Sequence, residues 1–208
     1  GIVGYIGNTK ASDIILHGLK WLEYRGYDSA GISTIENNNI YTSKCKGKIK
    51  DLQLLINDKK HNNSIGIGHT RWATHGEPTE ENAHPHEDNS RKFSLIHNGI
   101  IENHYSIKEY LIKENVKFSS DTDTEVLVQF IGYLYKKEKL NFYDTVKLAL
   151  KEVVGTYGIL IMCEDEPEKL IAAKNGSPLL IGIGNDETFI ASDVSAILDY
   201  TRNVLYLE

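Results

Sequence analysis

Apolar residues recur at the spacing of an α-helix near the start of the chain. Between residues 11 and 23 they are Ile14, Ile15, Leu19 and Leu22. Side chains three and four positions apart share one face of a helix, so this spacing predicts an amphipathic helix. We predict three further helices, over 103–115, from 122 onward and over 142–153.

The predicted helix that starts at 122 has the clearest start signal. Thr122 is followed three positions later by Glu125 and then by an apolar run. The threonine hydroxyl accepts a backbone N–H of the first turn, and the glutamate completes the capping box. Asp123 stands in that first turn, where the helix dipole favours a carboxylate, and this structural role is an alternative to a functional one.

Most of the remaining chain predicts β-strands. The expected strands cover 1–7, 29–35, 40–46, 65–70, 93–97, 157–162, 170–173, 179–183 and 188–191. In the last third only short turns separate them, which indicates antiparallel pairing because parallel strands need long crossovers. Long helices with antiparallel strands predict an α+β layered fold. No long linker or repeat divides the chain, so we predict one domain over 1–208.

The composition is that of a soluble globular protein, and the charge excludes some kinds of binding partner. Apolar residues make up 40% of the chain and charged residues 25%, as in soluble globular proteins. No run approaches the length of about 20 apolar residues that a transmembrane helix needs. The net charge of −6 argues against nucleic acid or an anionic membrane as the main partner. Two scattered cysteines, Cys45 and Cys163, fit a reducing compartment, so we expect a cytoplasmic protein without disulfides.

Two polar clusters, 23–31 and 69–78, each contain an arginine that is a candidate for a functional site. In 23–31, Gly26 permits a tight turn, and Arg25 is either a surface charge or a polar anchor near a site. The cluster 69–78 follows a predicted strand, where functional side chains gather. Its Arg71 offers a planar fork that grips a carboxylate through two hydrogen bonds. The alternative for this cluster is that Trp72 fills the core and its histidines cap nearby groups.

The string His97-Asn98-Gly99 has two interpretations. Asn-Gly is a common turn pair, and a turn after the strand 93–97 is the simpler one. An asparagine amide beside a glycine N–H also forms a sensible oxyanion hole, because two neutral donors converge on one oxygen. We predict no metal or other cofactor, since His69, His75, His84, His86 and His97 lack an H-E-x-x-H or C-x-x-C pattern.

Together these clusters resemble the class II glutamine amidotransferases, a family of N-terminal-nucleophile hydrolases. The matching segments occur in order along the chain, at 1–7, 23–31, 68–78, 82–86, 96–103, 120–125 and 176–179. The strings Tyr24-Arg25-Gly26-Tyr27-Asp28 and His69-Thr70-Arg71-Trp72-Ala73-Thr74-His75-Gly76 are the most specific. They resemble the branch that makes glucosamine 6-phosphate from fructose 6-phosphate more than the branches that serve purine, asparagine or glutamate synthesis.

The resemblance implies a four-layer αββα sandwich of two antiparallel sheets. It also implies that this domain hydrolyses L-glutamine and passes ammonia to synthetase/isomerase domains of the same enzyme, a homo-oligomer. None of those domains lies within 1–208. The chain ends at Glu208, in or just after a predicted strand, so we expect the natural domain to continue.

The resemblance also assigns roles to individual residues. Contacts to glutamine are implied for Arg71, Trp72, Thr74, His75, Gly99 and Asp123. A catalytic role is implied for Asn98 and Gly99 as the oxyanion hole, and for Arg25 and Gly26 against the nucleophile. The loop 71–78, with Gly76 and Pro78, is a candidate lid, and Trp72 a candidate gate for ammonia.

The family's nucleophile is an N-terminal cysteine with a free α-amine, expected immediately before Gly1. Neither Cys45 nor Cys163 owns such an amine, so we expect a chain that starts at Gly1 not to hydrolyse glutamine. Two alternatives stay open. The domain serves a different class II amidotransferase, or it senses glutamine without hydrolysing it.

Overall fold

A computed structural model describes residues 1–56, 61–72 and 77–208, apart from the side chain of Arg25. Its strands are β1 (Ile2–Ile6), β2 (Ser29–Glu36), β3 (Asn39–Lys46), β4 (Ile65–Arg71), β5 (His86–Glu87), β6 (Phe93–Ile101), β7 (Gly155–Cys163), β8 (Leu170–Asn175), β9 (Leu180–Ile183), β10 (Thr188–Ala191) and β11 (Val204–Tyr206). Its helices are α1 (Ala11–Leu22), α2 (Ile49–Ile56), α3 (His104–Lys113), α4 (Asp123–Glu138) and α5 (Phe142–Glu152), with short 3-10 turns η1 (Glu23–Arg25) and η2 (Val194–Ala196).

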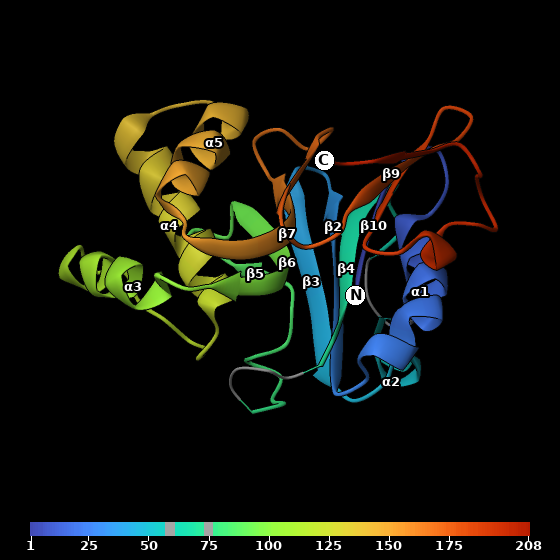
Figure 1. The fold of residues 1–208 in the computed structure, drawn as a ribbon, viewed down its shortest axis with the longest axis horizontal. Helices are drawn as coiled ribbons and strands as arrows, with labels where there is room; N and C mark the ends of the chain where they lie inside the picture. The colour runs from blue at the N-terminus through green and yellow to red at the C-terminus, as the bar shows by residue number, and fades with distance from the viewer. Residues whose placement is uncertain (57–60, 73–76) are drawn as a thin grey trace.

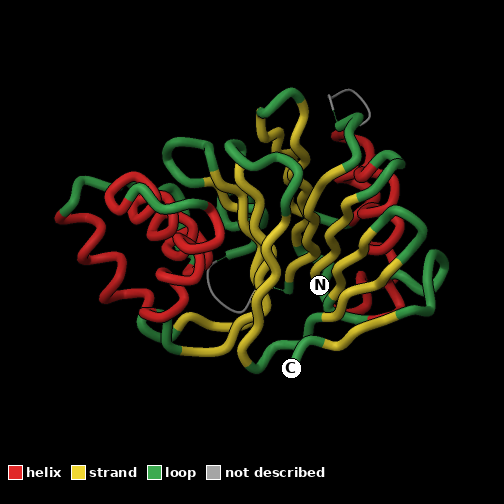
Figure 2. Tube along the Cα trace, turned by 90° about the horizontal axis from the view of Figure 1, so that it is seen from above, coloured by secondary structure: helices red, strands yellow, loops and turns green. Residues whose placement is uncertain are grey.

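The strands form two antiparallel sheets that face each other. The first sheet has seven strands in the order β11-β9-β10-β1-β4-β2-β3, and the second has four in the order β5-β6-β7-β8. Figures 1 and 2 show α1 and α2 outside the first sheet and α3, α4 and α5 beyond the second. The αββα sandwich implied by the resemblance is confirmed.

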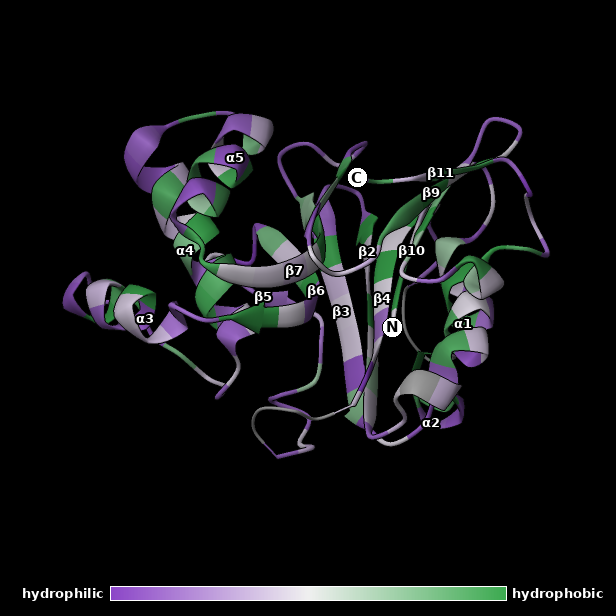
Figure 3. Cartoon of the chain, in the orientation of Figure 1, coloured by the Kyte–Doolittle hydropathy of each residue, from purple (hydrophilic) through white to green (hydrophobic). Residues whose placement is uncertain are grey.

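The alternation of side chains along β1 explains why both faces of the first sheet are buried. Successive residues of a strand point to opposite faces. Val3 and Tyr5 pack into the core under α1, whereas Ile2 belongs to the core between the two sheets. A third apolar core lies between the second sheet and α3, α4 and α5. Figure 3 shows these apolar positions on the strands and the polar ones in the loops.

The start of α4 is fixed as the capping-box signal predicts, with one difference. The Thr122 hydroxyl accepts the N–H of Glu125 at 3.1 Å. The Glu125 carboxylate, however, accepts the N–H groups of Ser119 and Ser120 at 2.8 and 2.6 Å instead of that of Thr122. The buried glutamate therefore fixes the approach to the helix as well as its first turn.

Two expectations from the sequence need correction. The strand expected over 93–97 runs to Ile101, so Asn98 and Gly99 lie inside β6 and do not form a turn. Pairing of β6 with β7 continues through Asn98 opposite Gly158 and Gly99 opposite Tyr157, which outweighs the local turn preference. The elements α2 and β5 lie outside the predicted set, whereas β11 falls where a strand was expected at the end of the chain. None of the described helices is long and apolar enough to cross a membrane.

Candidate active site

Polar groups from both sheets meet in a pocket of about 430 Å³ beside the start of β1. The predicted site residues that line it are Arg71, Trp72, Asn98, Gly99 and Asp123. Arg71 ends β4 of the first sheet, Asn98 and Gly99 belong to β6 of the second, and Asp123 opens α4. The pocket therefore depends on how the two sheets stack.

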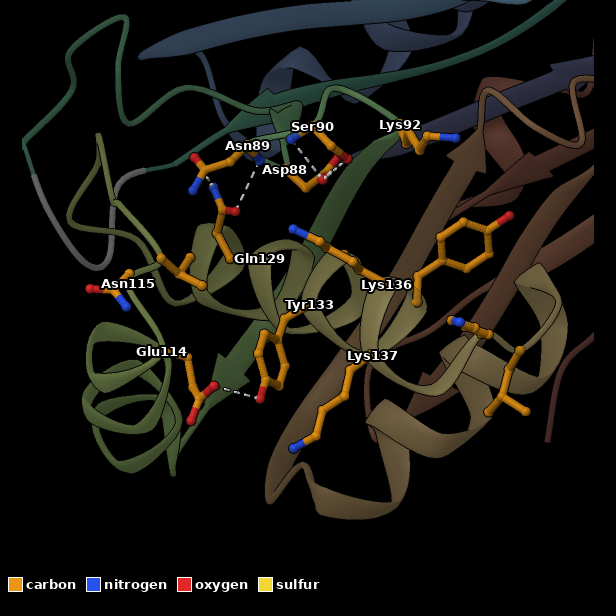
Figure 4. A pocket seen from close by; sticks show the side chains of 15 residues that line it. Asp88, Asn89, Ser90, Lys92, Glu114, Asn115, Gln129, Tyr133, Lys136 and Lys137 are labelled. Carbon is orange, nitrogen blue, oxygen red and sulfur yellow. Dashed lines mark hydrogen bonds between the residues drawn. The ribbon is translucent and has the colours of Figure 1, made fainter.

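A larger open cleft of about 1130 Å³ lies along α4, away from these residues (Figure 4). Several of its polar groups are bonded to one another. Asn89 and Gln129 exchange hydrogen bonds of 3.0 and 3.1 Å, and the Tyr133 hydroxyl donates to Glu114. The smaller pocket brings a buried arginine, an aspartate and an asparagine together from both sheets and the start of α4, so it is the better candidate for an active site.

The first residue of the chain reaches the pocket by pairing with β4. The Gly1 nitrogen donates to the Thr70 carbonyl at 2.6 Å, and the Thr70 N–H donates to the Gly1 carbonyl at 3.1 Å. A side chain on Gly1 would point away from the second sheet, because an added Cβ would lie 2.8 Å from the Leu22 side chain. Next along the strand, the Ile2 N–H donates to the Ser192 hydroxyl at 2.9 Å.

Arg71 and Asp123 give the pocket one cationic and one anionic side. Burial lowers the pKa of Arg71, and the nearby carboxylates of Asp28 and Asp123 partly offset this effect. The guanidinium stays charged, and one of its nitrogens lies 3.4 Å from the Glu77 carbonyl. Asp123 accepts the Ile101 N–H at 2.7 Å through one oxygen.

Gly99 has a backbone that only glycine adopts easily. Its φ is +127°, and an added Cβ would lie 2.1 Å from the Thr156 carbonyl oxygen. Gly99 is exposed, whereas the preceding strand residues 93–97 are buried. The backbone next to Asn98 is therefore open to a ligand, as an oxyanion hole requires.

Gly26, a predicted catalytic residue, packs against the backbone at the end of β4. An added Cβ on Gly26 would lie 2.6 Å from the Arg71 carbonyl carbon and 2.7 Å from the Trp72 nitrogen, so Gly26 allows close approach to the end of β4. Arg25 lies in η1, just before it. Thr74 and His75, and with them most of the candidate lid, lie outside the described residues.

Trp72 does not fill the core, so that interpretation is wrong. Its exposed fraction is 58%, and its ring meets the Tyr27 ring edge-on at 5.5 Å. Of the two histidines in that cluster, His69 is buried and bonds to Asn98 at 2.9 Å, and His75 lies outside the described residues. Within the described ranges, no three His, Cys, Asp or Glu side chains are arranged to hold a metal ion.

Truncating Trp72 to alanine should lower the free energy of unfolding by only about 1 kcal/mol, the worth of one aromatic edge contact. A buried aromatic would cost roughly 3–5 kcal/mol. Urea denaturation of Trp72→Ala, Tyr27→Ala and the double variant checks this, because the two single effects should overlap if they share one contact. A loss near 4 kcal/mol would show that Trp72 is buried in solution.

Several lining residues were not predicted as site residues. They are Gly1, His69, Thr70, His84, His97, Ile100, Thr122, Thr124, Thr156 and Ser192. His69 and Thr70 belong to the string 69–76, in which Arg71 carries the clearer chemical signal because its fork matches a carboxylate. Thr156 and Ser192 carry no local signal, because only strand pairing brings them beside residues far away in sequence.

Comparison with known proteins agrees with this geometry. The sequence model of the glutamine amidotransferase domain matches residues 69–199. The chain is 52% identical over 211 residues to the glutamine–fructose-6-phosphate aminotransferase (isomerizing) of Bacteroides thetaiotaomicron, and 49% identical over 208 residues to that of Clostridium tetani. Each comparison covers the whole chain and 34% of the relative. The chain thus spans about a third of the length of these curated relatives.

Solved structures share the fold. The glutamine phosphoribosylpyrophosphate amidotransferase of Bacillus subtilis matches with a TM-score of 0.83 and 29% identity, over 99% of this chain and 44% of that one. An allosteric regulatory enzyme of purine biosynthesis matches with a TM-score of 0.82 and 28% identity, over 100% of this chain and 44% of that one.

Proposed function

This chain belongs to the glutamine amidotransferase domain family, and from that premise we propose that it hydrolyses L-glutamine to glutamate and ammonia. The observation that carries the proposal is the pairing of Arg71 and Asp123 in one pocket, with Asn98 and Gly99 beside them. Glutamine is a zwitterion at its α-carbon and carries a neutral amide at its far end. A cation, an anion and two neutral donors match those three groups.

We propose that a cysteine immediately before Gly1 is the nucleophile. Gly1 pairs with Thr70, so an antiparallel strand extended by one residue brings that residue opposite Arg71. Alternation along the strand gives it the orientation of Ile2, which packs between the two sheets. The thiol then faces the second sheet, which carries Asn98.

The other cysteines are poor candidates for this role. Cys45 lies on β3 and Cys163 on β7, and neither lines the pocket. Burial raises the pKa of each thiol to about 11, so both stay protonated near neutral pH. Because the thiolate is the nucleophile, neither would attack an amide at a useful rate.

An N-terminal cysteine would supply both nucleophile and base. An α-amino group titrates at about 7.7–8.0 and a thiol at about 8.5, so the amine can accept the thiol proton near the working pH. The thiolate attacks the side-chain amide carbon, and the tetrahedral oxyanion forms. The amine returns the proton to the leaving nitrogen as the carbon–nitrogen bond breaks and ammonia departs. Water then hydrolyses the γ-glutamyl thioester to glutamate and regenerates the thiol.

Asn98 and Gly99 would stabilise the oxyanion, and the charged pair would hold the substrate. The Asn98 carboxamide and the Gly99 N–H are neutral donors next to each other on β6, so they can bind the oxygen on which charge develops. The Arg71 fork would bind the α-carboxylate, with Thr74 and His75 assisting. Asp123, together with the Gly99 backbone, would bind the α-ammonium. Arg25 and Gly26 would lie against the nucleophile.

Within the family, we propose that the ammonia serves the synthesis of glucosamine 6-phosphate from fructose 6-phosphate. Identity of 52% to an aminotransferase of that name favours this branch over the phosphoribosylpyrophosphate branch, at 29%. Synthetase/isomerase domains of the same homo-oligomeric enzyme would receive the ammonia, with Trp72 gating its transfer. The two free thiols support a cytoplasmic location. Glucosamine 6-phosphate formation from fructose 6-phosphate and glutamine by the full-length protein tests the branch.

The proposed contacts of Arg71 with the α-carboxylate and of Asp123 with the α-ammonium of glutamine can be tested separately. Arg71→Lys keeps the charge but loses the fork, and Asp123→Asn loses the charge that would pair with the ammonium. Charge-assisted hydrogen bonds contribute about 1.5–3 kcal/mol, so each change should lower kcat/KM for glutamine by about 10- to 100-fold, mainly through KM. Steady-state glutamate release by the cysteine-bearing protein measures both.

Two analogues of glutamine provide the matched controls. 4-Aminobutanamide lacks the α-carboxylate, so Arg71→Lys should leave its hydrolysis unchanged. Glutaramate lacks the α-ammonium, so Asp123→Asn should leave its hydrolysis unchanged. If each substitution slows both analogues as much as glutamine, these side chains support the fold and do not contact the substrate.

A further inference from the structure

We propose that His69 is a positioning residue that holds the amide nitrogen of Asn98 toward the substrate. The inference rests on the proposed function, in which Asn98 donates to the oxyanion. His69 lies on β4 of the first sheet and Asn98 on β6 of the second, and the His69 Nε2 to Asn98 Oδ1 distance is 2.9 Å. This contact spans the gap between the sheets at the pocket wall.

The chemistry of this contact fixes the orientation of the Asn98 amide. A carbonyl oxygen only accepts, so His69 must donate through a protonated Nε2. With Oδ1 occupied by His69, the Asn98 NH₂ group points the other way and can donate to a ligand. A reversed amide would present its carbonyl oxygen to the oxyanion and repel it.

The surroundings of His69 favour the required tautomer. Burial lowers the pKa of the His69 imidazole well below its usual range, and His97 and Arg71 act in the same direction. The neutral ring carries one proton. Its Nδ1 is buried and has no hydrogen-bond partner among the described residues. An unpartnered N–H there would be the costlier arrangement, so the proton belongs on Nε2.

Neighbouring rings hold His69 in place. His84 stacks on it with ring centroids 4.3 Å apart, and His84 Nδ1 accepts the His97 N–H at 3.3 Å. His86 meets His84 at 5.0 Å and bonds to the Thr122 hydroxyl at 3.0 Å, and Thr122 caps the helix that begins with Asp123. The His69 ring therefore cannot rotate freely, as a positioning role requires.

The matched variants are His69→Gln and His69→Asn. Glutamine places its side-chain nitrogen near the position of Nε2, whereas asparagine places it near Nδ1, where it cannot reach Asn98. Both add one buried amide, so their effects on folding are comparable. In the full-length protein that carries the cysteine, His69→Gln should keep kcat within about 3-fold. His69→Asn should lower kcat by about 10- to 100-fold, part of the loss typical of a missing oxyanion donor, with little change in KM.

A double-variant cycle with Asn98→Ala separates positioning from a general structural role. In the Asn98→Ala background, His69→Asn should change kcat by less than about 3-fold, because the amide that it orients is gone. Nitrogen NMR of the imidazole should show the Nε2-protonated tautomer, a readout independent of activity. Equal losses in His69→Gln and His69→Asn, additive losses in the double variant, or an Nδ1-protonated ring would each overturn the inference.

The outcomes also distinguish this inference from the proposed function. If Asn98→Ala hydrolyses glutamine as fast as the parent, the oxyanion role itself fails. If Asn98→Ala is slow but His69→Asn is not, only the positioning role of His69 fails.

Discussion

Replacing the cysteine before Gly1 with alanine should abolish glutamine hydrolysis, lowering turnover by about 10⁴- to 10⁶-fold, as loss of a catalytic nucleophile does. A protein that starts at Gly1 should be equally inactive. The reason is structural as well as chemical. Pairing of Gly1 with Thr70 directs the preceding residue to Arg71, and the described cysteines have raised pKa values and lie elsewhere. Release of glutamate from glutamine, measured directly, checks the prediction.

A third form of the protein tests the base. One glycine added ahead of the cysteine keeps the thiol but turns its amine into an amide, which cannot accept a proton. This form should lose most of the activity, whereas mass spectrometry and thiol titration should show an intact thiol. Hydrolysis at the parent rate would mean that another group removes the proton. Activity in the alanine form would remove the N-terminal nucleophile from the mechanism.

Asn98→Ala should lower the turnover number by about 10²- to 10³-fold, the usual loss when one oxyanion donor is removed. The KM for glutamine should change much less, because the donor acts mainly on charge that develops after binding. Asn98 is the practical donor to remove, since its partner is a backbone N–H. A side chain on Gly99 would instead clash with the Thr156 carbonyl and disturb the strand.

Asn98→Asp provides the matched control for Asn98→Ala. It keeps the shape of the amide but replaces the donor with a negative charge next to the developing oxyanion, so it should be at least as slow as the alanine variant. Thermal unfolding should place both variants near the parent. A collapse of glutamine binding with an unchanged turnover number would identify Asn98 as a substrate clamp instead.

The sequence alone determined the features that depend on neighbours along the chain. Helical spacing located α1, α3, α4 and α5, and the predicted ends differ from the observed ones by a few residues at most. The Thr122 cap follows from a hydrogen bond between residues three apart. The family resemblance, confirmed by the match over 69–199, also rests on contiguous strings. Such signals are local, so they survive without knowledge of the fold.

The tertiary structure alone decided which of two local interpretations holds at the site. The Asn-Gly pair predicts a turn, but pairing of Asn98 with Gly158 and of Gly99 with Tyr157 keeps both residues in a strand. The two-residue strand β5 is defined by its pairing with β6, which a short stretch of sequence does not specify. The contact between His69 and Asn98 joins residues 29 apart on facing sheets. His69, His84, His86 and His97 are buried and Trp72 is exposed because of how the layers stack, which no short stretch of sequence specifies.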